Sequence, residues 1–222
     1  GMAMDCCLRR RDGRSFDVED SAAPILDHAG VLRGAIIVFH DVSEARAMAV
    51  KMTYLANHDA LTGLPNRMLL RDRCEQAVQK AGRTGQRVAL LTLDLDHFKG
   101  VNASAGYGHG DMLLQHVARR LESAVPSGDT LSRQGGDEFL ISLPGADLDI
   151  GQKVIGHIRE QLAAAPHIES PAGHRVATTA SFGLALLEPD ISVEESIDRA
   201  DKALLVAKAA GRNRVCSWDP AV

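Results

Sequence analysis

The sequence predicts a three-layer domain of the α/β or α+β class, about 165 residues long, preceded by a short antiparallel β fragment. From His58 onward, segments with helical spacing of apolar residues alternate with short β-rich segments, as expected around a single sheet. Residues 87–94 are apolar at nearly every position, which is typical of a strand buried on both faces. With 222 residues, of which 45% are hydrophobic, the chain can bury such a core.

Residues 1–40 are predicted to form three short antiparallel strands. Asp12-Gly13 and Asp27-His28-Ala29-Gly30 have the composition of turns, and the stretch from Gly34 to Phe39 is rich in β-branched residues. Around Phe16 apolar and polar residues alternate with period two. About 40 residues rarely bury enough surface to fold alone, so this segment is too small for an independent core.

A helix is predicted over residues 41–57. Asp41 and Glu44 have the spacing of a capping box, and Met48, Met52 and Leu55 share one helical face. We interpret this helix as a rigid linker. A plain connecting helix and one half of a dimeric coiled coil fit the pattern equally well.

The remaining elements follow in order. Helical spacing or capping signals predict helices, and short apolar runs between turn residues predict strands. The expected helices cover 66–80, 110–125, 149–164 and 192–211, and the expected strands cover 87–94, 130–134, 139–143, 176–187 and 214–218. In the second helix Leu113, Leu114, Val117 and Leu121 are expected to face the core.

Composition excludes several classes of protein. There are 25 Lys and Arg against 29 Asp and Glu, so the net charge of −4 argues against binding nucleic acid through its phosphates. No apolar run approaches the roughly 20 residues of a membrane span, and we expect no membrane contact. The four cysteines form no CxxC pair, which favours a reducing, cytoplasmic environment.

Three carboxylates stand out as candidates for chemistry. Asp94 ends the buried strand, and Asp137 and Glu138 occupy the tip of a predicted hairpin behind Gly135-Gly136. Converging carboxylates repel one another unless a cation lies between them, and oxygen ligands suit Mg²⁺. The simpler interpretation is that Asp94 and Asp96 cap the following segment and that the hairpin acids are solvated; for any one acid taken singly, this interpretation is favoured.

A family resemblance adds to this pattern. Gly135-Gly136-Asp137-Glu138-Phe139 is the signature of the GGDEF family of diguanylate cyclases. Further segments resemble other family motifs in the same order, over roughly residues 57–218. These are His58–Arg67, Asp94–Asn102, Gly110-Asp111, Ser181–Gly183, Ala200-Asp201, Ala207-Lys208 and Gly211–Arg214.

The resemblance implies a nucleotidyl-cyclase-like fold, in the α+β class, with a central, mostly antiparallel sheet flanked by helices. It also implies a domain organisation of 1–40 as a partial PAS-like β fragment, 41–57 as the linker helix and 58–222 as the GGDEF domain. The PAS likeness lies in residues 8–44. Ser217–Ala221 resembles a junction that often leads into an EAL phosphodiesterase domain, so an EAL domain is a candidate partner in a longer chain.

The resemblance also implies site residues. Asp94, the Leu95 carbonyl and Asp137 would hold Mg²⁺, or Mn²⁺ as the alternative ion, with Glu138 as a further carboxylate. Asp137 and Glu138 would be catalytic, with Asp137 as general base for the 3′-hydroxyl. Other positions would bind substrate: Asn102 and Asp111 at guanine, Gly135 and Gly136 by allowing close approach, and His97, Phe98, Lys99, Lys208 and Arg212 at the phosphates.

The implied reaction joins two GTP molecules into cyclic dimeric GMP with release of two pyrophosphates. Because one subunit binds one GTP, a homodimer is expected. The alternative is a catalytically weak module that binds GTP and regulates an attached EAL phosphodiesterase.

Some positions depart from the family pattern. Pro126 replaces the Arg of an Arg-x-x-Asp motif for product inhibition, of which Asp129 remains, so this inhibition is expected to be lost. Ala103, Tyr107 and Leu205 also differ from the usual residues, and the first two are expected to border the guanine pocket.

Overall fold

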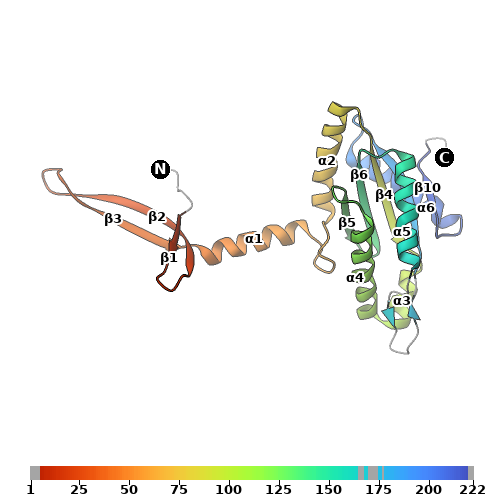
Figure 1. Ribbon diagram of the computed structural model, residues 1–222, viewed down its shortest axis with the longest axis horizontal. Helices are drawn as coiled ribbons and strands as arrows, with labels where there is room; N and C mark the ends of the chain where they lie inside the picture. The colour runs from red at the N-terminus through yellow and green to blue at the C-terminus, as the bar shows by residue number, and fades with distance from the viewer. Residues whose placement is uncertain (1–5, 165–167, 170–174, 177, 220–222) are drawn as a thin grey trace. The chain divides into compact units, whose positions relative to one another are not determined.

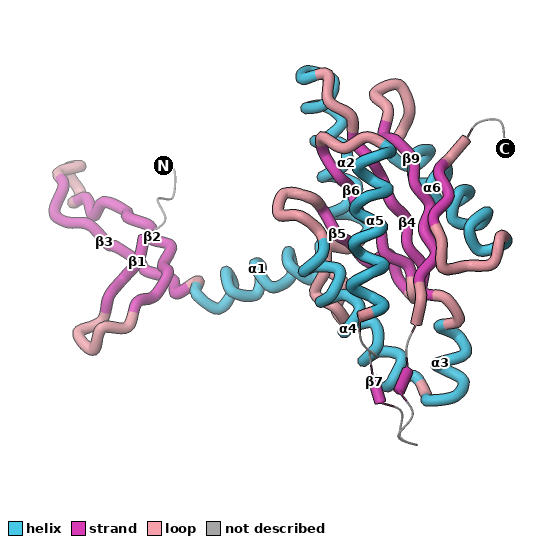
Figure 2. The backbone as a smooth tube through the Cα atoms, turned by 45° about the vertical axis from the view of Figure 1, so that its right-hand side comes forward, coloured by secondary structure: helices cyan, strands magenta, loops and turns pink. Residues whose placement is uncertain are grey.

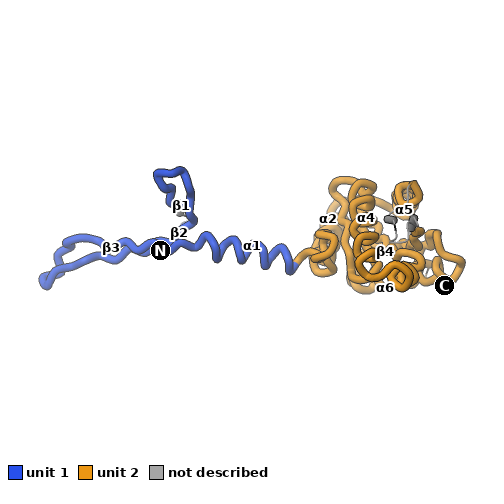
Figure 3. The backbone as a smooth tube through the Cα atoms, turned by 90° about the horizontal axis from the view of Figure 1, so that it is seen from below, with its two compact units in different colours: residues 1–56 blue, residues 57–222 orange. Residues whose placement is uncertain are grey.

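The computed structural model describes residues 6–164, 168–169, 175–176 and 178–219. They form two compact units, residues 1–56 and 57–222, which are coloured separately in Figure 3. Within the described residues no helix is long and apolar enough to cross a membrane.

The first unit is a three-stranded antiparallel sheet followed by a helix. Its strands are β1 (Cys6–Arg9), β2 (Ser15–Leu26) and β3 (Leu32–Asp41), in the order β1-β2-β3. Turns at Gly13 and Gly30, both with positive φ, connect them, which confirms the predicted hairpins. Helix α1 (Ser43–Asn57) has no buried residue, and the Asp41 carboxylate accepts a hydrogen bond from the Ser43 N–H at 3.0 Å.

The second unit is built around a five-stranded sheet with the order β10-β9-β4-β6-β5 (Figure 1). Its strands are β4 (Val88–Leu95), β5 (Thr130–Gly135), β6 (Glu138–Pro144), β9 (Ala180–Leu187) and β10 (Val215–Ser217). All neighbours pair antiparallel except β9 and β10, which are parallel. The mostly antiparallel α+β sheet is therefore confirmed. A separate short pair, β7 (Ile168–Glu169) and β8 (Arg175–Val176), lies outside it.

Helices cover both faces of this sheet (Figures 1 and 2). They are α2 (Arg67–Thr84), α3 (Phe98–Ala105), α4 (Tyr107–Ala124), α5 (Leu148–Ala163) and α6 (Val193–Ala209). Asn66, Asp147 and Ser192 cap α2, α5 and α6 by accepting N–H bonds from the first turns. As predicted, Leu113, Leu114, Val117 and Leu121 of α4 are buried.

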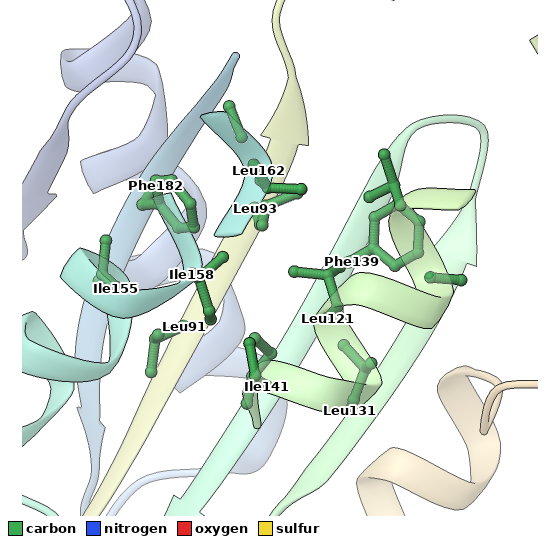
Figure 4. Close-up of a cluster of buried hydrophobic side chains, with 14 of the residues drawn as sticks. Leu91, Leu93, Leu121, Leu131, Phe139, Ile141, Ile155, Ile158, Leu162 and Phe182 are labelled. Carbon is green, nitrogen blue, oxygen red and sulfur yellow. The ribbon is translucent and has the colours of Figure 1, made fainter. Parts of the chain in front are cut away.

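The period-two pattern of the strands divides the core in two. On one face Leu91, Leu93, Phe139, Ile141 and Phe182 pack under α4 and α5, as Figure 4 shows. On the opposite face, even-numbered β4 residues such as Val88 and Leu90 pack against α2 and α6. Every residue of β4 is buried, which confirms the prediction of a strand covered on both sides.

Several element predictions need correction. The sequence predicts no element between residues 94 and 110, but this segment contains α3, an eight-residue helix that Phe98 anchors in the core. Helix α2 continues to Thr84 because Gly85, at φ 70°, provides its left-handed cap only there. The strand expected from residue 176 begins at Ala180; residue 177 lies outside the described residues.

Candidate functional site

The C-terminal end of β4 becomes polar on the face that α6 covers. Val88 and Leu90 on this face are apolar, but the next two even positions are Thr92 and Asp94. Thr92 Oγ1 donates to Asp201 Oδ1 of α6 at 2.9 Å, and Lys208 Nζ of α6 lies 2.8 Å from Asp94 Oδ2. Helix α6 is thus attached to β4 at two points two helical turns apart.

The hairpin between β5 and β6 lies beside this strand end. Glu138 pairs directly with Asp94 in the β4–β6 ladder, and the Leu95 N–H donates to the Asp137 carbonyl at 3.3 Å. Gly135 and Gly136 have φ of 133° and 52°, and a Cβ at either would meet no atom within 4 Å. The two glycines therefore permit the turn conformation and leave open space in front of it.

These elements enclose a cleft of about 520 Å³. Its lining joins the end of β4, the first turn of α3, the hairpin tip and the end of α6. The lining residues are Asp94, Leu95, Asp96, His97, Phe98, Lys99, Gly100, Asp137, Glu138, Lys208 and Arg212. The predicted metal and phosphate residues are therefore brought together.

The first turn of α3 forms one wall of the cleft. His97 adopts the left-handed conformation, φ 61°, immediately before the helix, and buried Phe98 anchors the turn. The first N–H groups of a helix have no partner within it and favour an anion. Because these residues line the cleft, the wall suits a phosphate group.

Burial and repulsion between neighbouring acids raise the pKa values of two cleft carboxylates, Asp94 and Glu138. Burial raises the pKa of Asp94; the ion pair with Lys208 opposes this, and the Asp137 charge adds to it. Burial also raises the pKa of Glu138, and repulsion from Asp201, Asp94 and Asp137 adds to the effect. Such repulsion is relieved when a cation is bound among the acids.

The acids of the cleft suit a divalent ion that is only partly held by protein ligands. Within the described part of the chain, no three Asp, Glu, His or Cys side chains are grouped closely enough to hold a metal by themselves. Mg²⁺ needs only one or two carboxylates, because water and substrate phosphates complete its shell. Asp94 and Asp137, electrostatically coupled and lining one cleft, fit that requirement.

The two predicted guanine residues lie outside the cleft lining. Asn102 is on α3 and its Oδ1 is buried with no hydrogen-bond partner among the described residues. A Cβ at Gly110 of α4 would come within 1.9 Å of this oxygen, so the absence of a side chain at Gly110 leaves room for the Asn102 side chain in this position. Asp111 follows Gly110 on α4 and is exposed. This oxygen is therefore a buried acceptor to which the described residues supply no donor.

Sequence reasoning gave no role to Arg133, which organises the hairpin. Its Nη1 donates to both oxygens of Asp59 at 2.8 Å, and its Nε and Nη2 donate to the Gly136 carbonyl at 3.1 and 2.7 Å. Arg133 is only 8% exposed. The sequence contains one signal for this role. Arg133 is the only charged residue in the strand Thr130–Gly135, and a buried Arg requires a partner.

Positions that depart from the family pattern lie away from the cleft. Ala103 is exposed, Tyr107 is 80% exposed and Leu205 is 63% exposed, and none of them lines the cleft. Pro126 is exposed, and partial burial raises the pKa of Asp129, for whose carboxylate the described residues supply no hydrogen-bonding partner.

Comparison with known proteins agrees with this geometry. Residues 56–214 match the family described as diguanylate cyclase, GGDEF domain. The chain is 36% identical over 217 residues to the probable diguanylate cyclase DgcE of Escherichia coli K12, covering 97% of this chain and 20% of that protein. It is 40% identical over 174 residues to the bifunctional diguanylate cyclase/cyclic di-GMP phosphodiesterase MucR of Pseudomonas aeruginosa, covering 76% of this chain and 24% of MucR.

Solved structures give the same result. The coiled coil and GGDEF domain of DgcB from Caulobacter crescentus, solved with c-di-GMP, matches with a TM-score of 0.73 at 29% identity, covering 79% of this chain and 93% of that one. A sensory box/GGDEF family protein from Caulobacter crescentus CB15 matches with a TM-score of 0.63 at 37% identity, covering 70% and 99%. The chain spans between a fifth and a quarter of the first curated relatives.

Proposed function

The chain belongs to the GGDEF family of diguanylate cyclases, and from that premise we propose that it condenses two GTP molecules into cyclic dimeric GMP. Each 3′-oxygen attacks the α-phosphate of the other nucleotide, and two pyrophosphates leave. The single observation that carries the proposal is the cleft itself. Acids at the end of β4 and at the hairpin tip line one space of 520 Å³ together with Lys208 of α6, Arg212 of the turn after α6 and the first turn of α3.

The proposed metal ligands are Asp94, the Leu95 carbonyl and Asp137, with Glu138 as a further carboxylate. Bound Mg²⁺, or Mn²⁺, would neutralise phosphate charge and lower the barrier to displacement at the α-phosphate. The pKa of Asp94 is raised by burial and by Asp137, so binding a cation there removes an existing repulsion. The loss of this repulsion between carboxylates favours the binding of a divalent ion in the cleft.

Proton transfer and phosphate binding are assigned to separate groups. The Asp137 carboxylate accepts the proton of the 3′-hydroxyl, at a hairpin tip whose two glycines leave room for a ribose. Lys208 Nζ, which contacts Asp94 at 2.8 Å, is placed to contact phosphate oxygens as well. Lys99, Arg212 and the N–H groups at His97 and Phe98 would hold the remaining phosphate charge.

Guanine recognition is proposed for Asn102 and Asp111. Guanine presents N1–H and N2–H₂ donors on its Watson–Crick edge, and adenine lacks that pair. The orphan Asn102 Oδ1 and the exposed Asp111 carboxylate, on neighbouring helices α3 and α4, supply acceptors. GTP is therefore expected to be preferred over ATP.

The proposed catalytic unit is a homodimer, since one cleft binds one GTP. Helix α1 supports it: it buries no residue, and its Met48, Met52 and Leu55 are all exposed. The matched DgcB structure also consists of a coiled coil and a GGDEF domain. We further propose that β1–β3 belong to a PAS domain. We also propose that this part of the chain lies in the cytoplasm, where GTP is available as substrate.

A second candidate is a GTP-binding module that regulates an attached EAL phosphodiesterase. The observation in its favour is the match to MucR, which is named as both cyclase and phosphodiesterase. The two candidates differ in one result: the module binds GTP without converting it.

The proposed function is tested by replacing Asp137 with Ala. Product formation from GTP and Mg²⁺ should fall at least 100-fold, while the far-UV circular dichroism stays that of the unmodified protein, because a hairpin-tip acid adds little to the core. The matched control is Asp72→Ala, an exposed acid on α2 whose contact is with Gln76. Turnover near the unmodified rate in Asp137→Ala would show that the catalytic assignment is wrong.

A further inference from the structure

The turn after α6 is held in an unfavourable backbone conformation. Arg212 and Asn213 have φ of 63° and 47°, and among described residues the third non-glycine with positive φ is His97, which lines the same cleft. A non-glycine residue in the left-handed region costs about 1–2 kcal/mol, and Asn tolerates it better than Arg. Two such residues in succession persist only where neighbouring groups fix them.

Asp96 is the group that fixes this turn from inside the protein. Its Oδ2 accepts the Asn213 N–H at 3.0 Å and the Thr179 hydroxyl at 2.6 Å, and its Oδ1 accepts the Ser181 hydroxyl at 2.7 Å. The residue is 4% exposed. Both oxygens are therefore engaged by protein donors, and the carboxylate is committed to structure rather than to a ligand.

The remaining contacts of the turn are exposed or lie within the backbone. Arg159 Nη2 donates to the Asn213 carbonyl at 2.9 Å at the surface, and the Arg212 N–H donates to the Ala207 carbonyl at 3.1 Å. The bond to Asp96 differs because its acceptor is a buried carboxylate. Hydrogen bonds to charged groups are worth about twice those between neutral groups.

We propose that Asp96 is a positioning residue, which acts by holding the Arg212 turn. By accepting the Asn213 N–H it keeps Arg212 in its left-handed conformation and its guanidinium at the phosphate side of the cleft. Asp96 follows Asp94 and Leu95, so it couples the strand end that carries the metal ligands to the turn that carries this arginine. This inference rests on the proposed function, since it needs Arg212 to bind phosphate.

The test uses the full chain and the kinetics of GTP turnover. Asp96→Asn keeps the volume but removes the charge, and it should raise KM for GTP roughly 5- to 20-fold. In an Arg212→Ala background the same change should alter kcat/KM less than twofold, because the arginine it positions is absent. Thr179→Val, which removes another donor to the same oxygen, should lower stability and leave KM unchanged.

Asn213 offers a pair of surface variants that do not endanger the fold. Asn213→Gly suits the left-handed turn and should keep KM near the unmodified value, whereas Asn213→Ala disfavours the turn and should raise KM in the same direction as Asp96→Asn. Combining Asn213→Gly with Asp96→Asn should recover part of the lost affinity. Additive effects of Asp96→Asn and Arg212→Ala, or equal KM values for the Gly and Ala variants, would overturn the inference.

Amide hydrogen exchange over residues 210–215 separates this inference from the proposed function. It needs no turnover, and exchange should be faster in Asp96→Asn and unchanged in Thr179→Val. Unchanged exchange in Asp96→Asn overturns the positioning role even if the protein makes cyclic dimeric GMP. Absence of product from the unmodified protein, with exchange behaving as expected, instead contradicts the proposed function.

Discussion

Removing the Arg133 side chain should destabilise the second unit and disturb the hairpin. Arg133 donates to Asp59 through Nη1 and to the Gly136 carbonyl through Nε and Nη2, at 2.7–3.1 Å. Arg133→Ala leaves a partly buried carboxylate and a carbonyl without this donor. Breaking a buried pair costs about 3–5 kcal/mol. Because Asp59 is 19% exposed and keeps its bonds from Thr62, we expect about 2–4 kcal/mol.

The assay is urea and thermal unfolding followed by circular dichroism. For a unit of this size 1 kcal/mol corresponds to roughly 2–4 °C, so the melting temperature should fall by roughly 5–15 °C. Arg71→Ala is the matched control, because Arg71 forms exposed pairs with Glu75 and Glu194 that are worth at most about 1 kcal/mol. The hairpin that Arg133 holds contains Asp137. Cyclase activity of Arg133→Ala should therefore fall by more than the fraction of unfolded protein accounts for.

The difference in unfolding free energy between the unmodified protein and Arg133→Ala should depend on pH. Burial raises the pKa of Asp59, but hydrogen bonds from Thr62 and Arg133 outweigh it, so the net pKa is lowered. A carboxyl with a lowered folded-state pKa stabilises the protein above its unfolded pKa, near 3.9, and this stabilisation is lost as pH falls through the folded value. The gap between Arg133→Ala and the unmodified protein should therefore narrow below about pH 4. A destabilisation under 0.5 kcal/mol at pH 7 would refute the reasoning.

Three further results are expected. Asp111→Ala should weaken GTP binding by roughly 10-fold or more in calorimetry, and equal affinity of the unmodified protein for ATP and GTP would contradict the guanine assignment. Added cyclic dimeric GMP should leave the initial rate almost unchanged, because Pro126 cannot pair with phosphate; strong noncompetitive inhibition at micromolar product would show that another surface has taken this role. Burial raises the pKa of the Cys74 thiol from 9.0 to about 11, so stability should fall by about 2–3 kcal/mol between pH 9 and 11 and this slope should be absent in Cys74→Val.

Much of the fold could be predicted because its signals are local. The continuous apolar run of β4, the caps of α2 and α6 and the alternation in β2 each follow from spacing along the chain. Helix α3 was missed because its eight residues give too short a pattern, and Phe98 holds it only through tertiary packing. The early part of the strand expected from residue 176 was wrong because apolar composition alone does not fix where pairing with β4 begins.

Site residues could be predicted from the sequence only where a short local motif contains them. Asp94, Asp137 and Glu138 could be identified in the sequence because an apolar run ends at Asp94 and a Gly-Gly pair precedes Asp137 and Glu138. The roles of Arg133 and Asp96 could not be derived in that way. Arg133 contacts Asp59, 74 residues away, and Asp96 contacts Thr179, 83 residues away, so their partners are set by the tertiary fold and not by spacing along the chain.

The most direct test of the central claim is phosphorus NMR of the unmodified protein with GTP and Mg²⁺. The proposed function predicts that cyclic dimeric GMP and pyrophosphate appear in a ratio of about one to two, from two α-phosphate displacements per product. It also predicts that activity per subunit rises with protein concentration, since two clefts must meet. GTP that stays bound and intact, or hydrolysis to GDP and phosphate without the cyclic product, would contradict it.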